Sequence, residues 1–159
     1  MPKIKVNNEK QLNELINNVA DKIENNTQLM KILANTMQYA VDQNFQSGGR
    51  PKWAGLKYRQ GQPLINTGEL RSSIRPEYGK NFALVGTNVP YAAIHQFGGK
   101  TKAHTIRPVL KKALAFNGGV FKAVNHPGSK IPARPFLKLT EQDERDLEQD
   151  VVDYINEQI

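Results

Sequence analysis

The chain has 159 residues, of which 38% are hydrophobic and 23% charged, a composition typical of a single globular domain and not of a disordered chain. It contains no cysteine, which excludes disulfides, thiol nucleophiles and cysteine-ligated metals, and no apolar run near the roughly 20 residues that span a bilayer. The start, MPKIKVNNEK, lacks the apolar stretch of a signal peptide, so we expect a protein that stays in the cytoplasm where it is made.

The formal net charge of +7 is distributed unevenly. Residues 1–47 contain five Lys/Arg and five Asp/Glu, residues 48–138 contain sixteen and two, and residues 139–159 contain one and eight. A neutral segment is therefore followed by a middle of +14 (16 minus 2) and a C-terminal segment of −7 (1 minus 8). Such a basic middle favours an acidic partner, nucleic acid among them.

The first 47 residues carry two stripes of apolar side chains at helical spacing. The first stripe consists of Leu12, Leu15, Ile16, Val19 and Ile23. The second consists of Leu29, Ile32, Leu33, Met37, Ala40, Val41 and Phe45. Asn25-Asn26-Thr27 interrupts the pattern, so we predict two amphipathic helices, or one long helix kinked at this point. The second helix should end at Ser47-Gly48-Gly49, because glycine readily takes the left-handed conformation that ends helices.

A basic, glycine-rich segment follows from Gly48 to Gln62 and is predicted to be a loop. Its lone Trp53 is expected to anchor the loop on the core, since an indole supplies a large buried area. The segments RSSIRPEY and FALVGT flank GKN and predict a β-hairpin. Pro76 confines its strand to a sheet edge or a bulge.

The segments TIRP, ALAF and VFKAV are predicted strands, with Asn117-Gly118-Gly119 as the turn between the last two. The segment IPARPFL is expected to be extended, because residues before proline are pushed out of the helical region. A final helix should begin at Thr140 as N-cap, with Glu141 and Asp143 in its first turn. We therefore predict one α+β domain over residues 1–159: helices in 1–47, a basic loop and a central antiparallel sheet with a short helix in 48–138, and an acidic helix in 139–159.

Local signatures of catalysis are missing from the sequence: there is no GxSxG, no HExxH, no Walker-type loop and no dinucleotide fingerprint. A zinc site of His95, His104 and His126 is an alternative, but these residues lie nine and twenty-two positions apart in segments that belong to different predicted elements. The acidic residues after Thr140 indicate a solvated or partner-facing surface rather than a buried acid/base pair. A structural or binding role is thus favoured over a hydrolase.

Four sequence blocks in order closely resemble the Mu-like bacteriophage virion morphogenesis proteins, related to tail completion proteins: the Trp53 loop, PLINTGELRSSI, VGTNVPYAAIHQFGG and IPARPFLKLTEQD. The resemblance implies a non-enzymatic structural protein without a cofactor, used late in phage assembly at the tail end or at the head–tail junction. The motif positions that it carries over are Trp53, Leu64, Thr67, Gly68, Leu70, Ile74, Gly86, Tyr91, Ala92, His95, Gln96, Phe97, Gly98, Arg134, Pro135 and Phe136. Residues 99–130 are longer than the simplest form of the pattern and resemble the strand pair and HPG turn of the broader group of neck and tail-completion proteins.

Within the third block, Tyr91, Ile94 and Phe97 are spaced by three and should fall along one side of a short helix. His95 and Gln96 then lie off that stripe. We expect His95 to hydrogen-bond to the backbone or to a neighbouring subunit rather than to perform catalysis.

The charge segregation predicts how subunits associate. If the acidic helix of one subunit faces the basic middle of the next, head-to-tail contacts can close a ring, with Asp143, Glu144 and Glu148 at the interface. The rival is an acidic helix that lies across its own basic sheet. The expected partners are the protein itself and other tail or neck proteins of the virion, without a membrane. The main alternative is a basic nucleic-acid-binding module with non-specific DNA contacts.

Overall fold

The helix α2 (Thr27–Ser47) is the longest element of the computed structural model, which describes residues 26–57, 59–109 and 112–157. It confirms the second predicted helix, and it ends where predicted, at Gly48 in the left-handed conformation (φ 73°). The first predicted stripe, from Leu12 to Ile23, lies outside the described residues.

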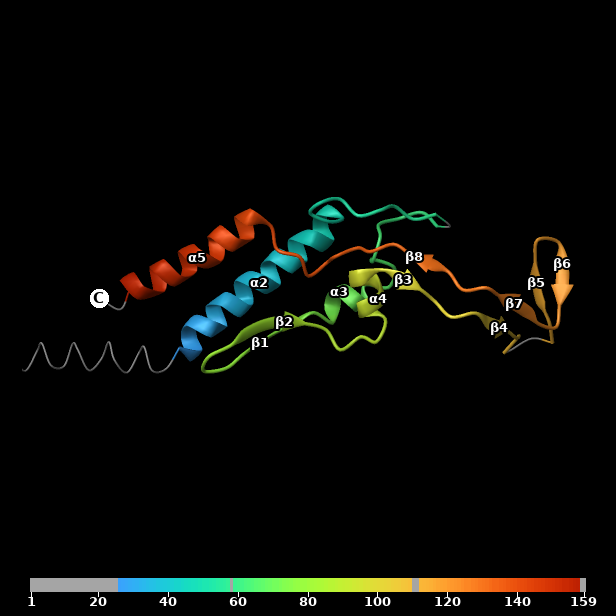
Figure 1. The fold of residues 1–159 in the computed structure, drawn as a ribbon, viewed down its shortest axis with the longest axis horizontal. Helices are drawn as coiled ribbons and strands as arrows, with labels where there is room; N and C mark the ends of the chain where they lie inside the picture. The colour runs from blue at the N-terminus through green and yellow to red at the C-terminus, as the bar shows by residue number, and fades with distance from the viewer. Residues whose placement is uncertain (1–25, 58, 110–111, 158–159) are drawn as a thin grey trace, which may run out of the picture.

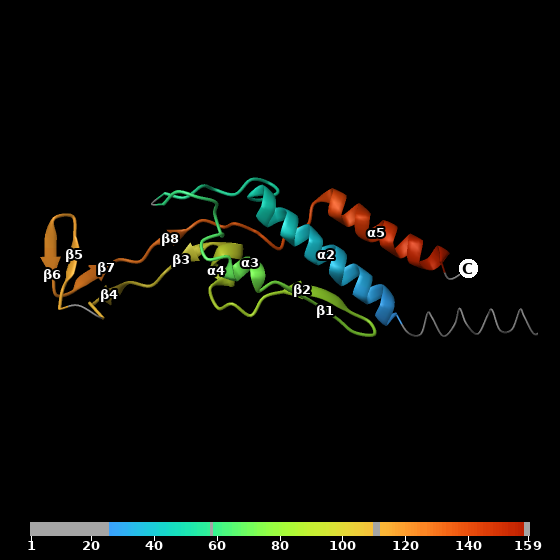
Figure 2. The same ribbon diagram turned by 180° about the vertical axis from the view of Figure 1, so that it is seen from behind.

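Helix α2 is the middle layer of the body. The acidic helix α5 (Glu141–Asn156) packs along one side of it, and the hairpin β1 (Arg75–Tyr78) and β2 (Ala83–Gly86) packs on the other (Figures 1 and 2). The hairpin pairs in the register Arg75↔Gly86 to Tyr78↔Ala83, which confirms the predicted hairpin. Pro76 lies in an edge strand, as its missing N–H requires.

Two short helices lie at one end of this body: α3 (Glu69–Ser72) and α4 (Ala92–Phe97). Helix α4 confirms the short helix expected from the spacing of Tyr91, Ile94 and Phe97. That stripe is nevertheless not its buried side, because α4 buries Ala92 and leaves Phe97 79% exposed. Helix α3 follows Gly68, whose φ of 82° suits a glycine at the start of the turn.

We call residues 99–131 the β arm. Its described residues, 99–109 and 112–131, form a long antiparallel ribbon that leaves the body at the end of α4 (Figures 1 and 2). Its three strand pairs follow one another from root to tip. They are β3 (Gly99–Lys100) with β8 (Lys130–Ile131), β4 (His104–Ile106) with β7 (Val124–His126), and β5 (Leu114–Phe116) with β6 (Gly119–Phe121).

The tip of the β arm has the turn predicted at Asn117-Gly118-Gly119. Asn117 and Gly118 both have positive φ, 47° and 75°, as a two-residue hairpin turn requires. The predicted strand VFKAV is divided between β6 and β7, with a bend at Lys122.

The α+β class with antiparallel strands is confirmed. The described strands form four two-stranded sheets instead of a single central sheet. The physical reason is the direction of the β arm, which carries its strands away from the body, so that they pair only with one another (Figure 1).

The core lies where α2, the loop after it, α3, α4 and the extended segment 132–138 meet. Phe45 and Phe136 are fully buried at its centre, with ring centroids 5.6 Å apart. The other buried members of this cluster are Val41, Trp53, Leu70, Ile74 and Ala92. Burial of one such large side chain stabilises the fold by about 1.5–3 kcal/mol.

Candidate functional site

Six of the sixteen predicted motif residues come together in this core, although they lie in segments far apart in the sequence. Trp53, Leu70, Ile74, Ala92 and Phe136 are buried members of the cluster, and Leu64 packs against it. The predicted anchoring of the loop by Trp53 is confirmed: its indole is 7% exposed and meets Phe45 edge-on at 5.6 Å. These residues hold together the elements that carry the exposed groups.

Arg134 joins three segments around this core. Its guanidinium donates from Nε to the Ala54 carbonyl at 2.8 Å and from Nη2 to the Gly55 carbonyl at 3.0 Å. Its backbone N–H donates to the His95 carbonyl at 2.7 Å. Burial, together with the positive charge of Arg59, lowers the pKa of Arg134. The arginine therefore fastens the Trp53 loop and α4 to the segment that precedes Phe136.

His95 is half-buried in α4, and its ring meets Tyr91 edge-on at 5.9 Å. Burial, followed by the charge of Arg134, lowers the pKa of its imidazole, so the neutral ring is favoured. Its buried Nδ1 has no hydrogen-bond partner among the described residues. The expected contact of the His95 ring with the backbone is therefore not made through Nδ1 within the described chain; it is the backbone carbonyl of His95 that is hydrogen-bonded.

The other motif residues of this region lie near the root of the β arm. Tyr91 donates its hydroxyl to Glu69 Oε2 at 2.9 Å, and this bond to a carboxylate raises the tyrosine pKa. Gln96 Oε1 accepts the Leu137 N–H at 3.1 Å. The ring of Phe97 is 79% exposed. The motif thus combines core anchors with exposed aromatic groups beside the arm.

The remaining motif residues are distributed over turns, β2 and the extended segment. Thr67 is exposed, and its hydroxyl accepts the Glu69 N–H at 3.3 Å. Gly86 ends β2, and Pro135 is half-buried between Arg134 and Phe136. The conformation of Gly98, with φ 73° and ψ 176°, is one that glycine takes readily and other residues avoid.

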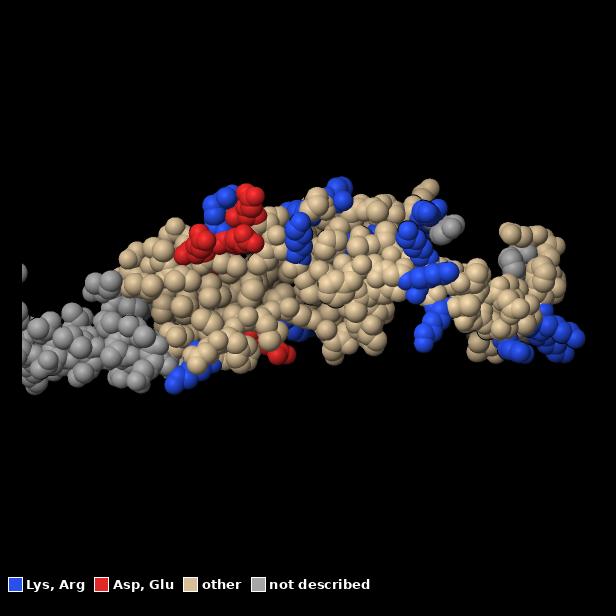
Figure 3. All heavy atoms as spheres, in the orientation of Figure 1, with Lys and Arg blue, Asp and Glu red and all other residues tan. Residues whose placement is uncertain are grey.

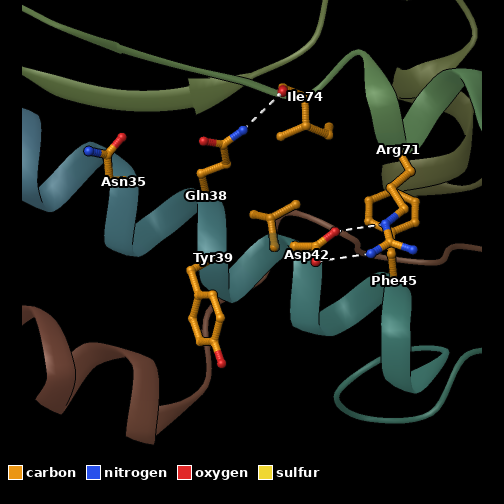
Figure 4. A pocket seen from close by; sticks show the side chains of 8 residues that line it. Asn35, Gln38, Tyr39, Asp42, Phe45, Arg71 and Ile74 are labelled. Atoms are coloured by element: carbon orange, nitrogen blue, oxygen red, sulfur yellow. Dashed lines mark hydrogen bonds and ion pairs between the residues drawn. The ribbon is translucent and has the colours of Figure 1, made fainter.

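A hollow of about 300 Å³ lies between α2 and the residues around Ile74 (Figure 4). Asp42 and Arg71 form an ion pair on its wall, with Arg71 Nε and Nη2 donating to the carboxylate at 2.7 and 3.0 Å. This pairing lowers the pKa of Asp42 and raises that of Arg71. Tyr39 lies at the rim and is 67% exposed. A carboxylate already held by an arginine is suited to structure or docking rather than to proton abstraction.

The start of α5 is held by a second ion pair. Thr140 and Asp143 form a reciprocal capping box, which confirms Thr140 as N-cap. Arg50 Nη2 lies 2.9 Å from Asp143 Oδ2, and its Nη1 lies 3.0 Å from Oδ1. Burial alone would raise the pKa of Asp143, but hydrogen bonds from Thr140 and Arg50 outweigh it and lower the pKa.

Asp143 therefore differs from Glu144 and Glu148, with which it was predicted to form an interface. Asp143 is 6% exposed and fully engaged within its own chain, whereas Glu144 and Glu148 are exposed. A charge that caps its own helix and pairs with Arg50 is not available to a second subunit. The carboxylates that a partner can reach on α5 are the glutamates.

Two of the three histidines considered for a zinc site lie together. His104 and His126 face each other across β4 and β7 with ring centroids 5.2 Å apart, while His95 lies in α4. No group of three or more His, Cys, Asp or Glu side chains is positioned to hold a metal ion in the described ranges.

The comparisons with known proteins agree with the sequence blocks. The model of the phage virion morphogenesis family matches residues 7–156. The chain belongs to the phage virion morphogenesis family. A relative of nearly equal length, "Mu-like prophage FluMu G protein 2" of Haemophilus influenzae (strain ATCC 51907 / DSM 11121 / KW20 / Rd), is 45% identical over 154 residues, which cover 97% of this chain and 96% of that protein.

A more distant relative of this family member is "Putative capsid assembly protein G" of Escherichia phage Mu. It is 32% identical over 87 residues, which cover 55% of this chain and 42% of that protein. No solved structure gives a significant match. Family membership assigns the chain to phage or prophage virion morphogenesis, as the resemblance implied.

The charge distribution of this family member can be followed on its surface. Figure 3 shows Asp and Glu gathered over α5, and Lys and Arg along the β arm and the loop after α2. In the described part of the chain, no helix has the length and apolar character that crossing a membrane requires.

The interactions that sequence analysis missed are the ion pairs Arg50–Asp143 and Asp42–Arg71 and the contacts of Asn44. The buried amide of Asn44 donates to the carbonyls of Phe136 and Lys138 at 2.9 and 2.8 Å, and its Oδ1 accepts from Arg50 Nε at 2.8 Å. A polar residue inside the otherwise apolar stripe of α2 was the only signal for it in the sequence.

Proposed function

We propose that the protein is a non-enzymatic structural component of the virion that acts in tail completion or in joining the tail to the head. It works through contacts with itself and with other tail or neck proteins, and it is assembled in the cytoplasm of the bacterial host. The observation that carries the proposal is the shape of the molecule: a narrow helical body with a long projecting β arm that exposes apolar and basic side chains (Figures 1 and 3).

The chemistry of the acidic groups supports a structural role. The two carboxylates whose pKa is lowered, Asp42 and Asp143, are each held by an arginine in an ion pair. A general base needs a carboxylate free to take a proton, which these contacts oppose. The exposed aromatic rings of Tyr39 and Phe97 are instead of the kind that anchors protein–protein interfaces.

The test is deletion of the gene from a lysogen that carries it, followed by induction and electron microscopy of the lysate. We expect filled heads and tails that are not joined, with infectivity restored by the full-length protein supplied from a plasmid. A lysate without heads would overturn the tail or neck assignment and would place the protein in capsid assembly, the role in the name of the phage Mu relative. A normal yield of infectious particles would overturn the assembly role altogether.

Mixing purified parts separates tail completion from head–tail joining. Tails from the deletion lysate are incubated with the protein, freed of excess and mixed with heads; the reciprocal experiment incubates the heads first. Infectivity that appears only after treatment of tails favours tail completion, whereas infectivity that appears only after treatment of heads favours a connector on the head.

The second candidate function is non-specific DNA binding, favoured by the composition of the β arm. Residues 99–131 contain seven Lys/Arg and no Asp or Glu. If DNA is the ligand, its affinity must fall steeply with salt, because bound phosphates release counterions. Fluorescence anisotropy of a labelled duplex across a salt series measures this dependence, and weak binding at low salt would exclude DNA as the partner.

A further inference from the structure

Within the described ranges, no second layer packs on the β arm. Each of its three strand pairs is a separate two-stranded sheet, and the ribbon extends beyond α4 along the long axis of the molecule (Figures 1 and 2). A two-stranded ribbon alone is marginally stable in water, and packing against another surface stabilises it. We therefore expect the arm to pack against a surface of another molecule.

The side chains of the β arm show what kind of surface it fits. Val109 is 94% exposed, Val120 is 75% exposed and Ile106 is 38% exposed. The same segment of the sequence contains seven basic residues and no acidic residue to balance them. A surface that combines exposed apolar groups with uncompensated positive charge fits a partner that combines apolar and acidic groups.

Helix α5 presents such a combination on one flank. Its inward side faces α2 and consists of Asp143, Leu147, Asp150, Val151 and Tyr154, all buried or half-buried. Another side of α5 carries exposed residues that lie three or four positions apart. We call this side the α5 flank: Glu141, Glu144, Glu148, Val152 and Ile155. Val152 and Ile155 are 49% and 51% exposed. Glu144 and Glu148 have no ion-pair partner in the part of the chain that the structure describes.

The arm does not reach the α5 flank of its own chain. Helix α5 begins beside the middle of α2 and runs toward the end of the molecule opposite to the arm, as both views show (Figures 1 and 2). The α5 flank and the β arm of one chain are therefore separated along its length, which argues against an acidic helix lying across its own arm. The complementary surfaces can meet only between two molecules.

We propose that the β arm of one copy binds the α5 flank of a second copy of this chain. This inference deepens the proposed function and rests on it: repeated head-to-tail contacts close a ring when the rotation between copies divides a full turn. Lysines of the arm meet Glu144 and Glu148, and the valines of the arm pack near Val152 and Ile155. Charge complementarity sets the register and the rate of encounter, and the apolar contacts supply affinity.

The test uses two charge-reversed full-length variants and their mixture. The flank variant is Glu144→Lys with Glu148→Lys, and the arm variant is Lys122→Glu with Lys130→Glu. Light scattering across a concentration series at low salt measures the mass of each. We expect oligomers for the wild type and the mass of one chain, 17.9 kDa, for each variant alone. In the mixture we expect restored oligomers, because the glutamates introduced into the arm of one variant meet the lysines introduced into the flank of the other.

A matched control places the same charge on the other side of the helix. Asp146→Lys with Asp153→Lys changes two exposed residues of α5 outside the flank and should leave the oligomer intact. Thermal unfolding checks that all variants fold, since every substituted side chain is exposed. A wild type that is monomeric at every concentration, or an oligomer indifferent to the flank and arm variants, overturns the inference.

Other occupants give other outcomes, each of which overturns the pairing. If the N-terminal segment of the same chain covers the flank, the flank variant loses thermal stability while the mass stays unchanged. If DNA covers the arm, the arm variant loses DNA binding and the oligomer is unaffected. Failure of the proposed function is seen separately, in the deletion lysate, because that readout does not depend on mass in solution.

Discussion

Arg50 and Asp143 lie 93 positions apart in the chain, and Nη1 and Nη2 of the guanidinium donate to Oδ1 and Oδ2 of the carboxylate. Arg50 Nη2 also donates to the Ala40 carbonyl at 2.6 Å. One side chain thus connects α2, the loop that follows it and the first turn of α5. Because Asp143 is also the acid of the capping box, this pair decides where α5 begins and how it lies on α2.

Replacement of Asp143 by Ala should therefore destabilise the fold. The change removes the cap and leaves Arg50 without its carboxylate, so we expect the free energy of unfolding to fall by about 3 kcal/mol. Urea denaturation measures it. Glu144→Ala, at the next position and exposed, is the control and should stay within about 0.5 kcal/mol of the wild type. Equal losses for the two variants would contradict the role assigned to the pair.

Because of the Asp143 carboxylate, we expect the free energy of unfolding to fall at acidic pH. The pKa of Asp143 is lower in the folded protein than the ordinary value of 3.8, so the unfolded chain binds the proton more readily. Its contribution is present above that value and is lost as the pH falls through the folded pKa. We expect Asp143→Asn to flatten the fall in unfolding free energy below about pH 4. Asp42, whose pKa is also lowered, retains part of the slope in that variant. An unchanged slope in urea titrations of D143N would count against the pairing.

His95 should give a second pH range in which acidification lowers the free energy of unfolding. The pKa of its imidazole in the folded protein lies below the ordinary value of 6.5. Between the two values the unfolded chain carries more protons, so acidification destabilises the fold. Stability contributed by the neutral ring is complete above about pH 6.5 and declines as the pH falls toward the folded pKa. His95→Gln should remove this decline. The assigned imidazole resonance, followed by NMR, checks the shift directly; a midpoint above 6.5 would refute it.

Asn44 should be the polar residue of the body that is hardest to replace. Its amide holds the segment around Phe136 to α2. Asn44→Ala leaves the buried carbonyl of Phe136, the partly buried carbonyl of Lys138 and Arg50 Nε without this partner. We expect a loss of about 2–4 kcal/mol, measured by urea denaturation. Asn35→Ala, on an exposed position of the same helix, should be nearly neutral. A small effect at Asn44 would mean that water replaces the amide.

The elements that sequence alone predicted are those whose signals are local. The stripe of α2, the glycines after Ser47 and the N-cap Thr140 act within a few residues, so they identify helices and their ends. What escaped prediction depends on distance in the chain. Asp143 has the same local pattern as an exposed acid, and only the position of Arg50 after folding makes it a buried one. The division of the strands into separate two-stranded sheets likewise depends on the direction of the arm. The spacing of apolar residues along the sequence does not indicate that direction.

Gly98 links the body to the arm, and its replacement should disturb both. A Cβ there would lie 2.8 Å from the Ala133 nitrogen and 3.1 Å from the Ile131 carbonyl oxygen, in a conformation that favours glycine. Gly98→Ala must strain the backbone by about 1–3 kcal/mol or shift the start of the arm away from segment 131–133. Gly86→Ala is the matched control, because a Cβ at Gly86 meets no atom within 4 Å. We expect G98A to lower the melting temperature and, since it redirects the arm, to lose self-association although every charge of the arm is retained. A variant that keeps the wild-type mass would show that binding tolerates a redirected arm, and that its charges rather than its orientation determine the contact.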